Sequence, residues 1–205
     1  SIIGKERIVW RYDPILINEH YTREYHKKYF QKLCDSLCNY TEKCTVSFVD
    51  LYKNTERNTK SLNIHTPSNE EVLELMSFFS KIAHENGIYI DTCTEEYDLS
   101  SLNIKHACCI DKSRLERIGN YQLKIGKDKN QRSICGCIES IDIGMYNTCE
   151  NGCMYCYANF NCEMARKNHN KHNPLSPLIS GEIEYDDKLN IRNVKSNINN
   201  QLQFF

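Results

Sequence analysis

Four short runs rich in β-branched and aromatic residues alternate with segments of helical periodicity along the first half of the chain. The runs are RIVWRYDP (7–14), TVSFVDLY (45–52), GIYIDTCTE (87–95) and IKHACCID (104–111). Runs of this length and composition, bounded by polar or glycine-containing segments, are typical of β-strands. We therefore predict four strands.

Amphipathic helices are predicted in the first two gaps between these strands. Residues 19–38 and 68–86 repeat apolar side chains every three or four positions, which is the period of a helix with one buried face. Ser68 and Glu71 have the spacing of a capping box at the start of the second helix, and Gly87 supplies its end. Shorter helices are expected near 112–118 and over about 158–171.

The order of the elements and the places of the polar residues predict the fold class. Strand–helix–strand alternation favours an α/β protein with a parallel sheet. The predicted strands end in polar residues, namely Arg11 and Asp13, Asp50, Cys93 and Glu95, and Cys109 and Asp111. Because (β/α) barrels build their sites at the carboxyl ends of the strands, we expect part of a TIM-type barrel. An open doubly wound sheet also places its sites at the carboxyl ends of the strands, so it stays an alternative.

The chain divides by composition into three expected segments. Residues 1–120 are β/α barrel units, 121–187 form a cysteine-rich iron–sulfur segment of the same domain, and 188–205 are a polar tail. The sequence PLISGE at 177–182 is expected to form one more short strand. Since the chain starts almost directly in a strand-like run, we expect it to be the later part of a longer protein.

Composition and charge exclude several classes of function. The chain has 205 residues, and 26 Lys and Arg against 27 Asp and Glu give a net charge of −1. Such a balance offers no electrostatic case for nucleic acid or an anionic membrane surface. No apolar run approaches the length of a membrane span. The chain has twelve cysteines, and those after residue 92 fall in tight local groups, which favours metal ligation in a reducing compartment, so we expect a cytoplasmic protein.

The sequence TCENGCMYCY carries the most informative of these groups. Cys149, Cys153 and Cys156 follow the pattern C-x3-C-x2-C. A loop of this kind can place three thiolates at three corners of a cubane cluster and leave the fourth iron without a protein ligand. The alternative is a structural zinc site, for which Cys137 or Cys162 would supply the fourth ligand.

A second group of cysteines comes from separate parts of the chain. Cys135 and Cys137 form a C-x-C pair, and Cys93 and Cys109 stand at the ends of neighbouring predicted strands. We expect Cys93 and Cys109 to lie close together. The four thiolates would hold either a second iron–sulfur cluster or a structural zinc ion. The alternative is that Cys93 and Cys109 are ordinary core residues.

The three-cysteine loop resembles the cluster loop of the radical S-adenosylmethionine (SAM) superfamily. The aromatic Tyr155 before the last cysteine and the continuation YCYA match that loop. The resemblance implies a [4Fe–4S] cluster whose open iron is chelated by SAM. In that superfamily a strand precedes the loop, as ESIDIGMY would here, and a Gly-Gly-Glu-like turn after it contacts SAM. Gly181 and Glu182 of ISGE match that turn, although Ser180 replaces a glycine.

The chain as a whole is similar to the family called domain of unknown function 1848. The resemblance runs from IGKERIVWRYDPILIN to CGCIESIDIGMYNTCENGCMYCYANF. It implies a barrel whose cluster unit has moved to the carboxyl end, with about a hundred residues upstream of Ser1 for a domain of ordinary size.

These observations predict an iron–sulfur protein that cleaves SAM reductively. The resemblance implies a small-molecule or unknown substrate and an electron donor such as a ferredoxin or flavodoxin. Arg11 and Asp13 in WRYDP are the candidate catalytic residues, and a purely internal ion pair is their alternative role. The competing interpretation of the whole chain is a non-enzymatic protein with structural zinc or an electron-transfer cluster.

Overall fold

The computed structural model describes residues 2–199 and divides the chain into two compact units. The first unit comprises the described residues of Ser1–Val49, Asn63–Ser140 and Asn197–Phe205, and the second comprises Asp50–Leu62 and Ile141–Ser196. The predicted boundaries at 120/121 and 187/188 stay predictions. No helix of the described part is both long and apolar enough to cross a bilayer.

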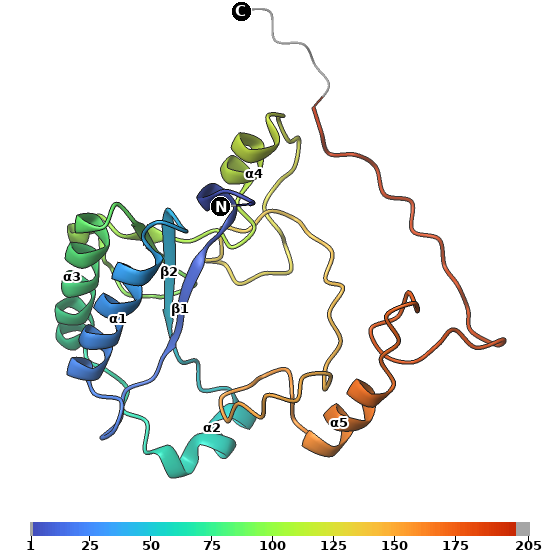
Figure 1. The fold of residues 1–205 in the computed structure, drawn as a ribbon, viewed down its shortest axis with the longest axis horizontal. Coiled ribbons are helices and arrows are strands. Elements are labelled where there is room, and N and C mark those ends of the chain that lie inside the picture. The colour runs from blue at the N-terminus through green and yellow to red at the C-terminus, as the bar shows by residue number, and fades with distance from the viewer. Residues whose placement is uncertain (1, 200–205) are drawn as a thin grey trace, which may run out of the picture. The chain divides into compact units, whose positions relative to one another are not determined.

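The first unit is built on an open sheet of four parallel strands in the order β1-β2-β3-β4 (Figure 1). The strands are β1 (Trp10–Ile15), β2 (Lys43–Phe48), β3 (Tyr89–Thr92) and β4 (Lys105–His106). All four lie within the predicted runs or overlap them, and the α/β class is confirmed. Each strand lies beside the next one in the chain. Within residues 2–199 the sheet does not close into a barrel.

Helices α1 (Arg23–Leu37) and α3 (Asn69–Glu85) pack side by side on one face of this sheet (Figure 1). The core between helices and sheet is aromatic, with the rings of Phe30 and Phe79 stacked at a centroid distance of 3.9 Å. Both amphipathic helices predicted from the sequence are confirmed, and so is the capping box of Ser68 and Glu71.

The start of α1 differs from its predicted position at residue 19. The side chain of Asn18 accepts hydrogen bonds from the backbone N–H groups of His20 and Tyr21, at 2.9 and 2.7 Å. This turn holds the backbone out of the helix until Thr22, whose hydroxyl caps α1 by accepting from the N–H of Tyr25.

The opposite face of the sheet is polar. Successive side chains of a strand point to opposite faces of the sheet. The residues that alternate with the apolar ones along the strands therefore lie together on the second face. They include Arg11, Asp13, Lys43, Thr45 and Asp91, and the register places Arg11 opposite Thr45 and Thr45 opposite Asp91. The sheet therefore buries an apolar face under α1 and α3 and gathers charge on the other face.

The first unit continues through α4 (Lys112–Gly119), which follows β4 as predicted. The side chain of Asp111 caps this helix by accepting from the N–H of Arg114 at 3.2 Å. The unit also contains the 3-10 helices η1 (Lys5–Arg7) and η3 (Ser100–Leu102). Part of the expected polar tail pairs with the unit, because Leu123 and Ile198 form an antiparallel bridge.

The second unit contains α2 (Lys53–Thr59), η2 (Lys60–Leu62) and α5 (Cys162–Asn170). The helix predicted over 158–171 is confirmed as α5, and it starts later because Asn161 caps it by accepting from the N–H of Met164. Helix α2 was not predicted. Its sequence, KNTERNT, lacks the apolar periodicity that identifies a helix.

Two strands expected around the cysteine loop are not formed. Residues 139–146 form no strand, and residues 177–181 form bends instead of a strand. The reason at 177–182 is local. The N–H of Gly181 bonds to the carbonyl of Lys171, and the hydroxyl of Ser180 bonds to the carbonyl of Asn168. The segment therefore folds back onto the end of α5.

Candidate functional site

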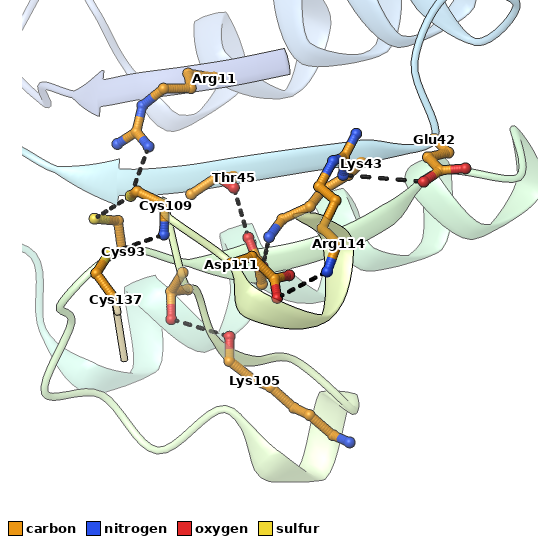
Figure 2. A network of polar contacts seen from close by, with 12 residues as sticks. Arg11, Glu42, Lys43, Thr45, Cys93, Lys105, Cys109, Asp111, Arg114 and Cys137 are labelled. Carbon is orange, nitrogen blue, oxygen red and sulfur yellow. Dashed lines mark hydrogen bonds and ion pairs between the residues drawn. The ribbon is translucent and has the colours of Figure 1, made fainter. Parts of the chain in front are cut away.

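Two cysteines meet at the carboxyl ends of β3 and β4. The sulfur atoms of Cys93 and Cys109 lie 3.4 Å apart (Figure 2). The N–H of Ala107 bonds to the carbonyl of Thr92, so the two strand ends continue side by side beyond His106. The predicted proximity of the two cysteines is confirmed.

Of the C-x-C pair that was predicted to lie beside Cys93 and Cys109, Cys137 makes the direct contact. The sulfur of Cys137 accepts hydrogen bonds from the N–H groups of Cys109 and Ile110, at 3.1 and 3.3 Å. Cys135, two residues before Cys137, is buried like Cys137, and burial and this neighbouring thiol raise the pKa of Cys137. We call Cys93, Cys109, Cys135 and Cys137 the strand-end cysteine group.

A short hairpin-like loop brings the C-x-C pair to this position. The N–H of Ile138 bonds to the carbonyl of Ile110 at 3.1 Å, and the N–H of Asp128 bonds to that of Cys137 at 3.0 Å. Lys127 and Ile138 form an antiparallel bridge that closes the loop. The segment from Lys127 to Ile138 thus places two thiols against the strand ends.

Arg11 gives the strand-end cysteine group a positive neighbour. Its Nη1 donates to the sulfur of Cys109 at 3.1 Å, and Figure 2 shows it pointing from β1 toward the thiols. The hydrogen bond from Cys93, together with the hydrogen bond and charge of Arg11, lowers the pKa of Cys109 to about 7 against the effect of burial. The same Cys93–Cys109 contact, together with burial, raises the pKa of Cys93. Cys109 is therefore the thiol of this pair that ionises first.

Arg11 also binds Asp13, its neighbour on the same face of β1. The Nε of Arg11 donates to Oδ2 of Asp13 at 2.9 Å, and the hydroxyl of Ser47 donates to Oδ1 at 2.5 Å. Burial opposes the charge of Arg11, but its hydrogen bonds to Asp13 and to the two thiols outweigh it and raise its pKa. The ion pair that was the alternative role for these residues is present, although its two side chains are 40% and 22% exposed and thus not fully internal.

A buried ion pair on the same face was missed from the sequence. Lys43 Nζ lies 2.6 Å from Oδ2 of Asp91, and the two side chains are only 8% and 3% exposed. The hydroxyl of Thr45 donates to the other oxygen of Asp91 at 2.7 Å. Lys43, Thr45 and Ser47 alternate along β2, and this alternation of polar side chains in an otherwise apolar strand was the available signal.

An open cleft of about 560 Å³ lies at the other end of the strands. Its walls include Lys43, Tyr89 and Lys105, the first residues of β2, β3 and β4. Arg114 and Arg117 of α4 also line it, and both pair with Glu42 (Figure 2 shows Arg114). The cleft is thus at the amino ends of the strands, opposite the end that carries the strand-end cysteine group.

The three-cysteine loop belongs to the second unit. Cys149 and Cys153 are exposed, and Cys156 is partly buried. The N–H of Cys156 bonds to the carbonyl of Cys153, which forms a turn, and the N–H of Asn159 donates to the sulfur of Cys156 at 3.3 Å. Gly152 turns the chain between the thiols with a φ of +67°, which a side chain would disfavour.

Asn147 closes the base of this loop and was missed from the sequence. It is buried, and its side-chain oxygen accepts from the N–H groups of Phe160 and Asn161 at 3.0 and 3.1 Å. Its own N–H bonds to the carbonyl of Ala158, and its carbonyl accepts from the side chain of Asn168 in α5. A single asparagine therefore ties both ends of the loop to the following helix.

The residues expected to contact SAM lie on the loop and after α5. Tyr155 is 41% exposed on the loop. Gly181 has a φ of +83° and closes the turn after α5, and the side chain of Asn173 donates to Glu182. Their role toward a cofactor stays a prediction.

The donor atoms of both groups are sulfurs, the ligands that iron–sulfur clusters and zinc use in proteins. All twelve cysteines are free thiols. Among residues 2–199, however, no three His, Cys, Asp or Glu side chains already converge closely enough to hold a metal ion. Thiolate sulfurs suit an iron–sulfur cluster or a zinc ion. To bind either one, the sulfurs would have to move closer together.

Fold and thiols together define an α/β protein with two separate sets of candidate sulfur ligands. Residues 1–158 match the family model described as domain of unknown function (DUF1848). The chain therefore belongs to the DUF1848 family. The match includes the strand-end cysteine group and all three cysteines of the loop. Neither the comparison with curated proteins nor that with solved structures gave a match.

Proposed function

We propose that this protein binds a [4Fe–4S] cluster through Cys149, Cys153 and Cys156 and cleaves SAM reductively. The observation that carries the proposal is the C-x3-C-x2-C loop itself, with its aromatic neighbour Tyr155. The loop's two exposed thiols and the N–H donated to the sulfur of Cys156 support it, because hydrogen bonds to sulfur stabilise thiolate ligands.

A cluster held by three thiolates keeps one iron free for a small chelating ligand. When bound, it would supply one electron that breaks a carbon–sulfur bond of SAM, giving methionine and a 5′-deoxyadenosyl group that takes hydrogen from the substrate. The electron would come from a ferredoxin or flavodoxin. In this proposal Tyr155 shields the cluster, and Gly181 and Glu182 contact the amino group of SAM.

We propose further that the open sheet is part of a (β/α) barrel. Strands that follow each other in order, with helices against one face, are the arrangement of such a barrel. The polar face would then line its interior. Arg11 and Asp13, which lie within β1 on its polar face, would be positioned to contact a small-molecule substrate there. The free thiols favour a reducing compartment, the cytoplasm.

The cluster assignment is tested by anaerobic reconstitution with iron and sulfide. The variant Cys149→Ala/Cys153→Ala/Cys156→Ala should bind about four irons fewer per chain than the wild type, because one cubane is lost. Cys162→Ala is the matched control, since it removes an exposed thiol six residues after the loop. In the wild type, adding SAM should change the electron paramagnetic resonance spectrum of the reduced cluster.

Two outcomes would count against the proposal. Equal iron content in the wild type and the triple variant would show that the loop does not hold the cluster. A cluster that binds to the loop but does not respond to SAM would favour the competing interpretation, an electron-transfer protein. Stoichiometric zinc on the loop after anaerobic reconstitution would favour a structural site.

A further inference from the structure

We propose that the strand-end cysteine group is a second metal centre, one that binds a single tetrahedral zinc ion through thiolates only. Cys93, Cys109, Cys135 and Cys137 all belong to the first unit. The proposal does not depend on a cluster at the three-cysteine loop, which belongs to the other unit.

The spacing of the first two sulfurs favours one metal ion over a second cubane. The sulfurs of Cys93 and Cys109 are 3.4 Å apart. Two thiolates on one tetrahedral zinc, with zinc–sulfur bonds of about 2.3 Å, lie roughly 3.8 Å apart. In a cubane each thiolate binds a different iron, so the sulfurs stand farther from one another. The observed pair is therefore close to the separation of two ligands on one ion.

The C-x-C pair is placed to supply the remaining ligands. Cys137 accepts hydrogen bonds from the backbone N–H groups of Cys109 and Ile110, and Cys135 is buried two residues before it in the same loop. Such hydrogen bonds stabilise a thiolate and fix its orientation, as partners of metal ligands do. Because no three candidate ligands among residues 2–199 yet converge on one point, zinc binding must draw Cys135 and Cys137 toward the other two thiols.

The charge around the group favours an anionic centre. Zinc with four thiolates carries two net negative charges, which need compensation when they are partly buried. Arg11, which also pairs with Asp13, offsets part of this charge, because its guanidinium donates to the sulfur of Cys109. A centre at this position would join β1, β3, the segment after β4 and the C-x-C loop. It would therefore stabilise the carboxyl end of the sheet.

The test uses the full chain with Cys149, Cys153 and Cys156 replaced by alanine, so that the loop contributes no metal. After reduction and dialysis against zinc, this background should retain about one zinc per chain against a weak chelator. Cobalt in place of zinc should give the ligand-field and sulfur charge-transfer bands of a tetrahedral thiolate site. Adding Cys109→Ala or Cys137→Ala should abolish zinc retention and the cobalt bands. Cys108→Ala, which removes the thiol next to Cys109, is the matched control and should keep both signals.

Alkylation of the background protein gives a readout that does not depend on the folding of any core variant. Bound zinc should protect Cys93, Cys109, Cys135 and Cys137 from iodoacetamide, as read by mass spectrometry. Absence of zinc retention by the reduced protein would overturn the proposal. So would about four irons per chain in the background variant, which indicates a second cubane. Loss of the metal in Cys108→Ala would also overturn it, because the ligand set would be wrong.

Discussion

His26 shows how a single side chain can make the stability of this fold depend on pH. It is buried on α1, its Nε2 lies 2.9 Å from the carbonyl of Leu16, and its Nδ1 lies 2.9 Å from the hydroxyl of Tyr12. A carbonyl can only accept, so Nε2 carries the proton and Nδ1 accepts from Tyr12. Burial lowers the pKa of His26, and the bond to Leu16 opposes this only in part.

We predict that the free energy of unfolding falls as the pH drops below about 6.5, the unperturbed pKa of histidine. In that range the unfolded chain takes up a proton that folded His26 does not, so acid favours unfolding. One such group contributes a slope of at most about 1.4 kcal/mol per pH unit. The measurement is urea unfolding of the wild type and His26→Gln between pH 7.5 and 5.5.

His84→Gln, on the exposed side of α3, is the control and should keep the wild-type slope. An unchanged slope in His26→Gln would contradict this account of the buried imidazole.

The buried ion pair of Lys43 and Asp91 is a second feature at the residue scale that affects the stability of the fold. Both side chains are almost fully buried, so removing one leaves an unpaired charge in the interior. Asp91→Asn should therefore destabilise the protein by about 3–5 kcal/mol in denaturant unfolding. Lys112→Met, at the exposed pair with Glu116, should cost less than about 1 kcal/mol. Equal losses in the two variants would mean that Lys43 and Asp91 are solvated.

At the level of elements, long periodic segments were predictable and short or polar ones were not. Helices α1 and α3 followed from apolar periodicity, because both bury a face against the sheet. The fourth strand was predicted over 104–111 but only Lys105–His106 are paired. The segment leaves the ladder there because the backbone at Cys109 and Ile110 bonds to the sulfur of Cys137 instead. Such a contact between distant segments has no local signal.

The capping box of α3 offers a prediction at this scale. The hydroxyl of Ser68 accepts from the N–H of Glu71, and the Glu71 carboxylate accepts from the N–H of Ser68. Ser68→Ala should lower the free energy of unfolding by about 1 kcal/mol, since one donor at the helix start loses its partner. Ser36→Ala is the control, because Ser36 bonds only within its own helix. An equal loss in both variants would contradict a capping role.

At the scale of the whole molecule, the sequence predicted which thiols gather but not what surrounds them. Cys93 and Cys109 were placed together because parallel strands end at one edge of a sheet. Asn147 and the Lys43–Asp91 pair were not anticipated, since their partners come from segments far along the chain or from loop backbone. The family match covers both sets of cysteines.

The most direct test of the proposed function is the formation of 5′-deoxyadenosine. The reconstituted chain is reduced with dithionite in the presence of SAM, and the products are quantified by mass spectrometry. The account predicts 5′-deoxyadenosine and methionine in equal amounts from the wild type and from Cys162→Ala, and none from Cys149→Ala/Cys153→Ala/Cys156→Ala. A wild-type chain that holds about four irons on the loop but forms no 5′-deoxyadenosine would contradict it.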